Sequence, residues 1–198
     1  MDFYGFYTGK IFDAYQYLGA HTEKTGVTFR TFAPSASRIA VIGEFNDWQE
    51  SEMNKVYDGN FWECYIPEAK PGQMYKYRIY DRNDNPVDHC DPYGFGMELR
   101  PNSASIVRDM SKYKFKDSKW MQNRSDCRQK PLNIYEIHFG SFRKPSDKTD
   151  DWYTYEEMID ILIPYLTENG YNCLEIMPLN EYPCDESWGY QATGFFQS

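Results

Sequence analysis

Residues 74–80 read Met-Tyr-Lys-Tyr-Arg-Ile-Tyr, a run in which large side chains alternate with cationic ones. Tyr75, Tyr77 and Ile79 occupy every second position, and Lys76 and Arg78 lie between them. Successive side chains of a strand point to opposite faces of its sheet, so this alternation predicts a strand with one buried side. We therefore expect a half-buried β-strand here.

Short β-prone runs surround this stretch, and turn residues separate them. Pro71 and Gly72 precede it, and the polar run 81–86, Asp-Arg-Asn-Asp-Asn-Pro, follows it. Strands spaced this closely, with no helical periodicity between them, predict a compact, immunoglobulin-like β-sandwich. The other runs expected to be its strands are residues 27–32, 38–43, 61–66 and 104–107.

The pattern changes in the last third of the chain. Residues 133–139, Asn-Ile-Tyr-Glu-Ile-His-Phe, and 172–177, Asn-Cys-Leu-Glu-Ile-Met, both read as strands. Between them Thr154 and Glu157 form a capping box, which predicts the start of a helix. Strand, helix and strand in this order predict a right-handed crossover between parallel strands. The expected apolar stripe of the helix is Tyr155, Met158, Ile159, Leu162 and Leu166.

These patterns divide the chain into four segments. Residues 1–20 form a lead segment, 21–117 the β-sandwich, 118–131 a polar linker and 132–198 the βαβ part. Two parallel strands do not make a domain by themselves, so the last segment is expected to belong to a larger α/β structure. The predicted fold class is therefore multidomain, with β followed by α/β.

The composition favours a neutral, hydroxylated partner. The 198 residues carry a net charge of −9, which argues against general binding to nucleic acid or anionic lipid. Aromatic residues make up 18% of the chain, and an acidic surface rich in rings suits a carbohydrate binder. No apolar run approaches the ~20 residues of a membrane span, and residues 1–5 do not begin a signal peptide. We expect no membrane contact and a cytoplasmic location.

The cysteines and histidines form no ligand pattern. The five cysteines are irregularly spaced without a CxxC pair, so neither a zinc site nor a disulfide framework is indicated. Reduced thiols, as in the cytoplasm, are the plain interpretation. Without a cluster of oxygen ligands for calcium, we expect no metal and no cofactor. The cysteines are Cys64, Cys90, Cys127, Cys173 and Cys184.

Two blocks of motifs stand out. The first comprises residues 43–48 (Gly-Glu-Phe-Asn-Asp-Trp), 75–78 (Tyr-Lys-Tyr-Arg) and 91–93 (Asp-Pro-Tyr). The second comprises residues 134–142 (Ile-Tyr-Glu-Ile-His-Phe-Gly-Ser-Phe) and 187–194 (Ser-Trp-Gly-Tyr-Gln-Ala-Thr-Gly). In this order and spacing they resemble bacterial-type 1,4-α-glucan (glycogen) branching enzymes. The first block is similar to their family-48 carbohydrate-binding module, and the second to the opening of their catalytic barrel.

The resemblance implies that residues 132–198 begin an α-amylase-type (β/α)8 TIM barrel and are an incomplete part of it. Branching enzymes cut an α-1,4 bond of a glucan and transfer the segment to a 6-hydroxyl in glycogen biosynthesis, by a retaining mechanism with two carboxyls. The family's catalytic Asp, Glu and Asp lie on later strands of a barrel that takes ~250 residues. We therefore expect no catalytic residue in residues 1–198, and an inactive fragment whose open strand edges promote self-association.

The resemblance also assigns glucan contacts to the second block. Tyr190 matches the family tyrosine that stacks on the glucose at the cleavage point, and Gln191 follows it. Trp188 is either a further sugar contact or part of the loop scaffold. Where the family usually has a histidine after Glu181, this chain has Tyr182, which puts one polar contact of that loop in doubt.

In the first block, related modules grip glucan with a tryptophan and a lysine at the positions of Trp48 and Lys76. The alternative is that Trp48 covers the end of the sandwich and Lys76 is a solvated side chain. Trp62 is a further surface candidate, for which core packing is the competing interpretation. The expected partners are α-glucans: glycogen, amylose and maltooligosaccharides.

Two other functions stay open. One is a debranching or trehalose-releasing hydrolase of the α-amylase superfamily, since those enzymes also join such a module to a barrel. The other is a non-catalytic glucan-binding or scaffold protein. Gln191 after Tyr190 favours branching, because the hydrolases usually carry a different residue there. The barrel-like strands at 132–198 argue against a simple binder.

Overall fold

The computed structural model describes residues 1–99, 101–112, 114–124, 130–145 and 152–194. The chain divides into two compact units, Met1–Lys112 with Asn180–Ser198, and Tyr113–Leu179. Cys127 and most of the predicted linker's second half lie outside the described residues. The other four cysteines are free thiols. No helix in the described ranges has the length and apolar character needed to cross a membrane.

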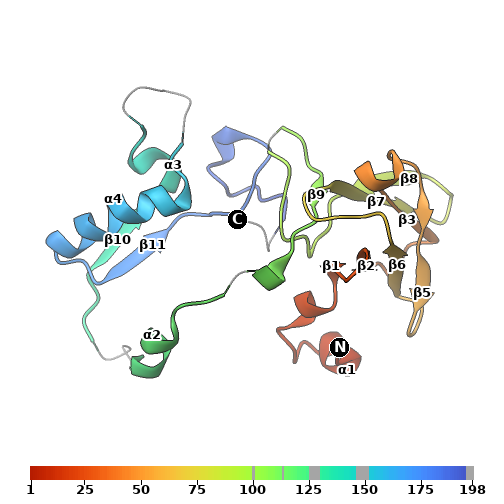
Figure 1. Ribbon diagram of the computed structural model, residues 1–198, viewed down its shortest axis with the longest axis horizontal. Coiled ribbons are helices and arrows are strands. Elements are labelled where there is room, and N and C mark those ends of the chain that lie inside the picture. The colour runs from red at the N-terminus through yellow and green to blue at the C-terminus, as the bar shows by residue number, and fades with distance from the viewer. Residues whose placement is uncertain (100, 113, 125–129, 146–151, 195–198) are drawn as a thin grey trace. The chain divides into compact units, whose positions relative to one another are not determined.

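The first unit, called the sandwich unit below, contains two antiparallel sheets (Figure 1). The predicted β-sandwich is thereby confirmed. One sheet has the order β1 (Gly19–Thr22), β2 (Val27–Phe32), β6 (Phe61–Ile66) and β5 (Asn54–Val56). The other has the order β4 (Ser51–Glu52), β3 (Arg38–Gly43), β7 (Met74–Tyr80) and β8 (Pro86–His89). β9 (Ser105–Ile106) pairs with Met74 and Tyr75 at the start of β7, whereas β8 pairs with residues 77–80 of that strand.

β7 is the stretch 74–80, and the predicted alternation holds from Tyr75 to Arg78, whereas Ile79 is partly buried and Tyr80 is buried. Tyr75 and Tyr77 are fully buried, whereas Lys76 and Arg78 are partly exposed on the opposite face. Both buried tyrosines donate their hydroxyl protons to Oδ2 of Asp91, at 2.7 and 3.1 Å. Asp91 is itself fully buried, so this carboxyl joins the central strand to the chain that follows β8.

The N-terminal residues belong to the same unit. α1 (Phe3–Tyr7) and η1 (Ala14–Gln16) precede β1, and Ala14 and Leu18 pack against the buried ring of Phe61. Phe61 and Trp62 are neighbours on β6 and point to opposite sides of the sheet. Trp62 enters the core between the sheets, and residues 1–18 cover Phe61 on the other side. The segment that the sequence marks only as a lead therefore completes the sandwich.

The second unit, called the βαβ unit below, contains the predicted βαβ arrangement. β10 (Ile134–Ile137) and β11 (Cys173–Ile176) are parallel, with Ile134 opposite Cys173. α3 (Phe139–Phe142) and α4 (Tyr155–Glu168) lie between them in the chain. Within the expected linker, α2 (Ser118–Asn123) is helical.

α4 begins at the predicted capping box and packs with a narrower stripe than predicted. The amide of Glu157 donates to Thr154 Oγ1, and the Thr154 amide donates to the Glu157 carboxylate. Met158, Leu162 and Leu166 are buried, whereas Tyr155 and Ile159 are exposed. A sheet of two strands is narrow, so it covers only one row of side chains on the helix.

The buried carboxyl predicts how stability varies with pH. Burial raises the pKa of Asp91 from 3.8 to about 6, against the opposing hydrogen bonds from Tyr75, the Tyr93 amide and Tyr77. The folded state therefore holds this proton more tightly than the unfolded chain. Below pH 4 the protonated Asp91 contributes about 3 kcal/mol to the free energy of unfolding. This contribution is lost as the pH rises through 6.

We expect Asp91→Asn to remove this dependence. Unfolding in urea, measured from pH 4 to pH 7, gives the free energy of unfolding for both proteins. The wild-type value minus the Asp91→Asn value should fall by about 3 kcal/mol across that range. Asp84→Asn, at an exposed carboxyl, serves as the control. Parallel profiles for wild type and Asp91→Asn would refute the raised pKa.

Candidate functional site

The turn after β3 carries Trp48, and Asn46 holds that turn in place. The Gly43 amide donates to Asn46 Oδ1 at 2.9 Å. Asn46 Nδ2 donates to the Val41 carbonyl at 3.1 Å and to Ser51 Oγ at 2.9 Å. These bonds join the end of β3, the short helix η2 (Glu44–Asn46) and the start of β4. The sequence motif contains Asn46, but its clamping role depends on pairing that only the folded structure provides.

Trp48 is exposed on this clamped turn, in a strained backbone. Asp47 and Trp48 have φ values of 53° and 59°, and the Trp48 amide donates to the Gly43 carbonyl at 2.8 Å. The left-handed conformation costs roughly 1–2 kcal/mol for a residue with a Cβ. The side chain is 39% exposed, so core packing does not account fully for that cost. Strain of this kind is often kept where a side chain must be presented in one direction.

Lys76 lies on the outward side of β7, opposite to the side that carries the buried Tyr75 and Tyr77. Its register partner on β3 is Ile42, one residue before the Gly43 that anchors Trp48. Lys76 Nζ donates to Ser103 Oγ at 3.3 Å. The structure thus places Lys76 on β7 and Trp48 on the turn after β3, the strand that pairs with β7.

The two arginines of this sheet, Arg38 and Arg78, are paired with carboxylates. Arg38 donates to Glu50 at 2.7 Å, and Arg78 donates to both oxygens of Asp88 at 2.8 and 2.9 Å. The Tyr80 hydroxyl also donates to Glu50, and with Arg38 it lowers the pKa of that carboxyl. Lys76 differs from these two arginines in that it donates to a neutral hydroxyl, which suits contact with an uncharged ligand.

Trp62 is not a surface residue. It is 3% exposed in the core between the sheets, and its Nε1 donates to the Ala33 carbonyl at 3.1 Å. Its position on β6 turns it inward, opposite in direction to Phe61. Trp62 is therefore a core residue, as the packing interpretation expects. It is not a glucan contact, because no sugar can reach a buried ring.

A closed loop carries the second group of candidates, residues 180–194. Asn180 Nδ2 donates to the Gly194 carbonyl at 2.9 Å. The amide and the hydroxyl of Thr193 both donate to the Glu181 carbonyl, at 2.8 and 2.9 Å. Cys90 Sγ lies 3.1 Å from the Thr193 carbonyl, next to the buried Asp91. These bonds close the two ends of the loop on each other and tie it to the sandwich unit.

The aromatic residues of the loop are exposed at its tip. Trp188 follows η4 (Asp185–Ser187), has a φ of 55° and is 56% exposed. Tyr190 is 65% exposed, and its amide donates to the Ser187 carbonyl at 3.0 Å. Gln191 is also exposed. The loop therefore presents the three side chains that the resemblance assigns to glucan.

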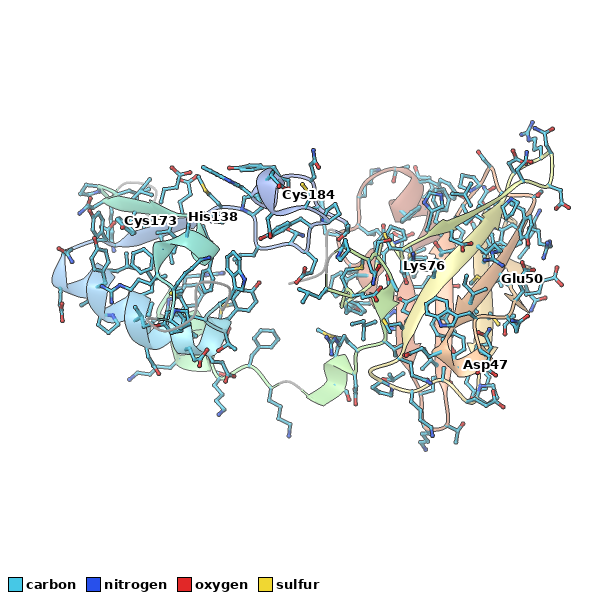
Figure 2. The ribbon with its side chains drawn as sticks, turned by 90° about the horizontal axis from the view of Figure 1, so that it is seen from above. Asp47, Glu50, Lys76, His138, Cys173 and Cys184 are labelled. Carbon is cyan, nitrogen blue, oxygen red and sulfur yellow. The ribbon has the colours of Figure 1, made fainter. Side chains whose placement is uncertain are left out.

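Glu136 and Glu175 are the carboxylates on the two strands of the βαβ unit. Glu136 and Glu175 are register partners on β10 and β11, and both are exposed on the side of the sheet away from α4. His138 lies 2.9 Å from Ser141 Oγ, at the start of α3 (Figure 2). In the described part of the chain, no three His, Cys, Asp or Glu side chains are grouped so that they could hold a metal.

Two hollows of the sandwich unit lie away from these candidates. One, of about 620 Å³, is lined by Thr22–Gly26, Pro67, Ala69–Pro71, Asp109 and Ser111. The other, of about 330 Å³, is lined by Ala33–Ala36, Ile79–Asp81, Asn85, Val87 and His89. The predicted residues line neither hollow. Trp48 and Tyr190 are thus presented on exposed turns outside both hollows.

Comparison with known proteins bears on these surfaces. Residues 17–94 match the family described as Carbohydrate-binding module 48 (Isoamylase N-terminal domain). Over 99% of its length the chain is 43% identical to the 1,4-alpha-glucan branching enzyme GlgB of Fusobacterium nucleatum subsp. nucleatum. It is 40% identical to the GlgB of Bacillus caldolyticus, also over 99% of its length. The chain is a relative of the 1,4-α-glucan branching enzymes. It spans about a third of the length of these relatives, 32% and 30% respectively.

Solved structures agree with this relationship at the level of the fold. A putative α-amylase from Salmonella typhimurium matches 91% of the chain and 28% of its own, with a TM-score of 0.66 and 22% identity. The catalytic module of the glycogen-degrading pneumococcal virulence factor SpuA matches 93% of the chain and 32% of its own, with a TM-score of 0.71 and 19% identity. The predicted order of a β-sandwich followed by a βαβ part therefore recurs in solved structures.

The clamp around Trp48 yields a stability prediction. Asn46→Ala removes three hydrogen bonds and leaves partly buried partners on β3 unpaired, so unfolding should become easier by about 2–3 kcal/mol. Gln49→Ala is the matched control on the same turn, because that side chain makes one exposed contact with the Asp47 carbonyl, at 3.4 Å. Urea unfolding followed by tryptophan fluorescence measures both. Equal midpoints for the two variants would show that Asn46 does not hold the turn.

Proposed function

We propose that this chain is the glucan-holding part of a 1,4-α-glucan branching enzyme. The observation that carries the proposal is the presence of two exposed aromatic surfaces, at Trp48 and at Tyr190, in a relative of branching enzymes with a family-48 module. The substrate is an α-1,4-glucan, and the product carries α-1,6 branches. The location proposed for this activity is the cytoplasm.

Stacking on aromatic rings is the chemistry that these surfaces supply. A pyranose ring has apolar C–H faces, which lie on an aromatic ring, and a rim of hydroxyls, which need polar partners. Tyr190 offers an exposed ring next to Gln191 in the chain, and Trp48 offers one on the turn after β3, the strand that pairs with the strand of Lys76. Each pair therefore combines a flat surface with a hydrogen-bonding group.

Holding the glucan matters particularly for a transfer reaction. In branching, a hydroxyl of a second glucan, and not water, must capture the glycosyl intermediate. An acceptor kept close to the site raises its effective concentration, which favours transfer over hydrolysis. We assign this holding role to the two surfaces. The bond-breaking role belongs to the Asp, Glu and Asp that the resemblance places on later strands.

The hydrolase and the free-standing binder are less well supported. The relatives that cover nearly the whole chain at about 40% identity are named as branching enzymes. Gln191 after Tyr190 points the same way. The βαβ unit of β10, α4 and β11 has no evident use in a protein that only binds sugar.

Glucan retention tests the two surfaces. In a native gel that contains glycogen, the 198-residue chain should migrate more slowly than in a gel without it. Trp48→Ala and Tyr190→Ala should each recover part of the lost mobility, because each removes one stacking ring at no change in charge. Phe115→Ala, at an exposed ring outside both surfaces, is the control. Retention unaffected by both Trp48→Ala and Tyr190→Ala would reject these surfaces.

Catalysis is a separate test. The 198-residue polypeptide should not branch amylose, because none of its residues matches the catalytic Asp, Glu and Asp of the family. The measurement is the absorbance of the iodine complex of amylose, which falls when branches form. A decrease that depends on the polypeptide, beyond that of a buffer control, would place the catalytic groups within residues 1–198.

A further inference from the structure

Three exposed aromatic residues of the described chain share an unusual backbone. Among the residues that the structure describes, five non-glycine residues have a positive φ, and Trp48, Trp188 and Tyr57 are the aromatic ones. A bulky residue in this region is rare, and such strain concentrates where a side chain must be presented. Trp48 and Trp188 belong to the surfaces described above. Tyr57 lies elsewhere, in the turn between β5 and β6 of the other sheet.

The ring of Tyr57 is held rigidly with one face open. It is parallel to the ring of Phe3, with the centroids 4.0 Å apart and an angle of 6° between the planes. Phe3 packs in turn edge-on against the buried Phe61, at 4.9 Å. Tyr57 has a φ of 57° and is nevertheless 65% exposed. One face of the ring therefore rests on α1, and the residue as a whole remains open to solvent.

Polar groups lie beside this ring in an ordered array. The Tyr7 hydroxyl donates to Asp58 Oδ2 at 2.6 Å and accepts from Asn60 Nδ2 at 2.9 Å. Asn60 Nδ2 also donates to Asp58 Oδ2, at 3.1 Å. The Tyr7 hydroxyl is the leading cause that lowers the pKa of Asp58, so the carboxylate is charged at neutral pH. Asp58 Oδ1 also accepts from the Asn60 amide at 3.0 Å. A carboxylate has about four acceptor positions, so Asp58 keeps capacity for a ligand hydroxyl.

We propose that Tyr57, with Asp58 and Asn60, forms a third glucan-binding surface of this chain. The Tyr57 ring stacks on the C–H face of a glucose unit, while Asp58 accepts from its hydroxyls and Asn60 orients the carboxylate. The inference rests on the proposed function for the class of ligand. It adds a site on the sheet opposite to Trp48 and Lys76, built by an N-terminal helix outside residues 17–94.

Charge supports a sugar over other occupants of this surface. Nucleic acid and anionic lipid would be repelled by the Asp58 carboxylate and by the net charge of −9. A neutral polyhydroxylated chain is free of that repulsion, and its hydroxyls match an acceptor carboxylate. The competing structural role for Tyr57 is a lid over Phe3, which requires packing but no flat ring.

The test separates these roles by the shape of the side chain. Tyr57→Leu keeps an apolar contact with Phe3 and the same backbone strain but removes the flat ring. Tyr57→Phe keeps the ring. The matched control is Tyr65→Ala, at another exposed tyrosine of the same sheet, whose hydroxyl lies 2.8 Å from Thr25 Oγ1. All are neutral substitutions in the full 198-residue chain, so mobility in a gel without glycogen should not change.

We expect Tyr57→Leu to weaken the apparent affinity for glycogen about threefold to tenfold, the amount of one lost stacking contact. Tyr57→Phe and Tyr65→Ala should bind like wild type. Wild-type retention in Tyr57→Leu, together with weakened retention in Trp48→Ala, would overturn this inference and leave the proposed function standing. No retention of wild type would overturn both. If Tyr57→Leu does not fold, as judged by circular dichroism, Asp58→Ala provides the same comparison against Asp84→Ala.

Discussion

The buried carboxyl of Asp91 is the interaction on which the sandwich unit depends. It accepts the hydroxyl protons of Tyr75 and Tyr77 from the central strand and the amide of Tyr93 from its own turn. The Asp91 amide donates to Ser105 Oγ on β9 at 2.8 Å. The Tyr77 hydroxyl also lies 3.4 Å from the Arg30 carbonyl of the opposite sheet. A buried carboxyl is costly unless its hydrogen bonds are satisfied, so these segments must assemble together.

This assembly stabilises the turns that contain strained residues. The left-handed conformations of Trp48, Tyr57 and Trp188 persist only if their surroundings oppose relaxation. For Trp48 the opposing structure is the Asn46 clamp, and for Tyr57 it is the Phe3 ring with the Tyr7–Asp58–Asn60 array. For Trp188 it is the closed neck of its loop. In each case the stabilising contacts come from segments that the sandwich unit holds.

The sequence predicts those parts of the structure whose side chains follow a strict period. The alternation in β7 and the capping box of α4 were both correct, because burial on one face repeats every second residue in a strand and every third or fourth in a helix. β1, β4, β5 and β8 were missed, since most of their residues are small or polar and their pairing is imposed by neighbouring strands. Trp62 and Phe61 are adjacent, so they face opposite sides of β6. The sequence does not say which of the two faces the core between the sheets. Tyr57 was missed because its partner Phe3 lies far away in the chain.

The placement of the proposed surfaces on exposed turns fits the proposed ligand. A glucan chain repeats the same unit, so several weak stacking surfaces can hold one polymer at once, and binding at one raises the effective concentration at the others. Each surface can then release its segment quickly while the polymer stays bound. A deep pocket would bind one chain end tightly and slow the exchange of segments that transfer requires. Rigid rings on separate turns therefore suit an enzyme that must move glucan segments better than a single enclosed site does.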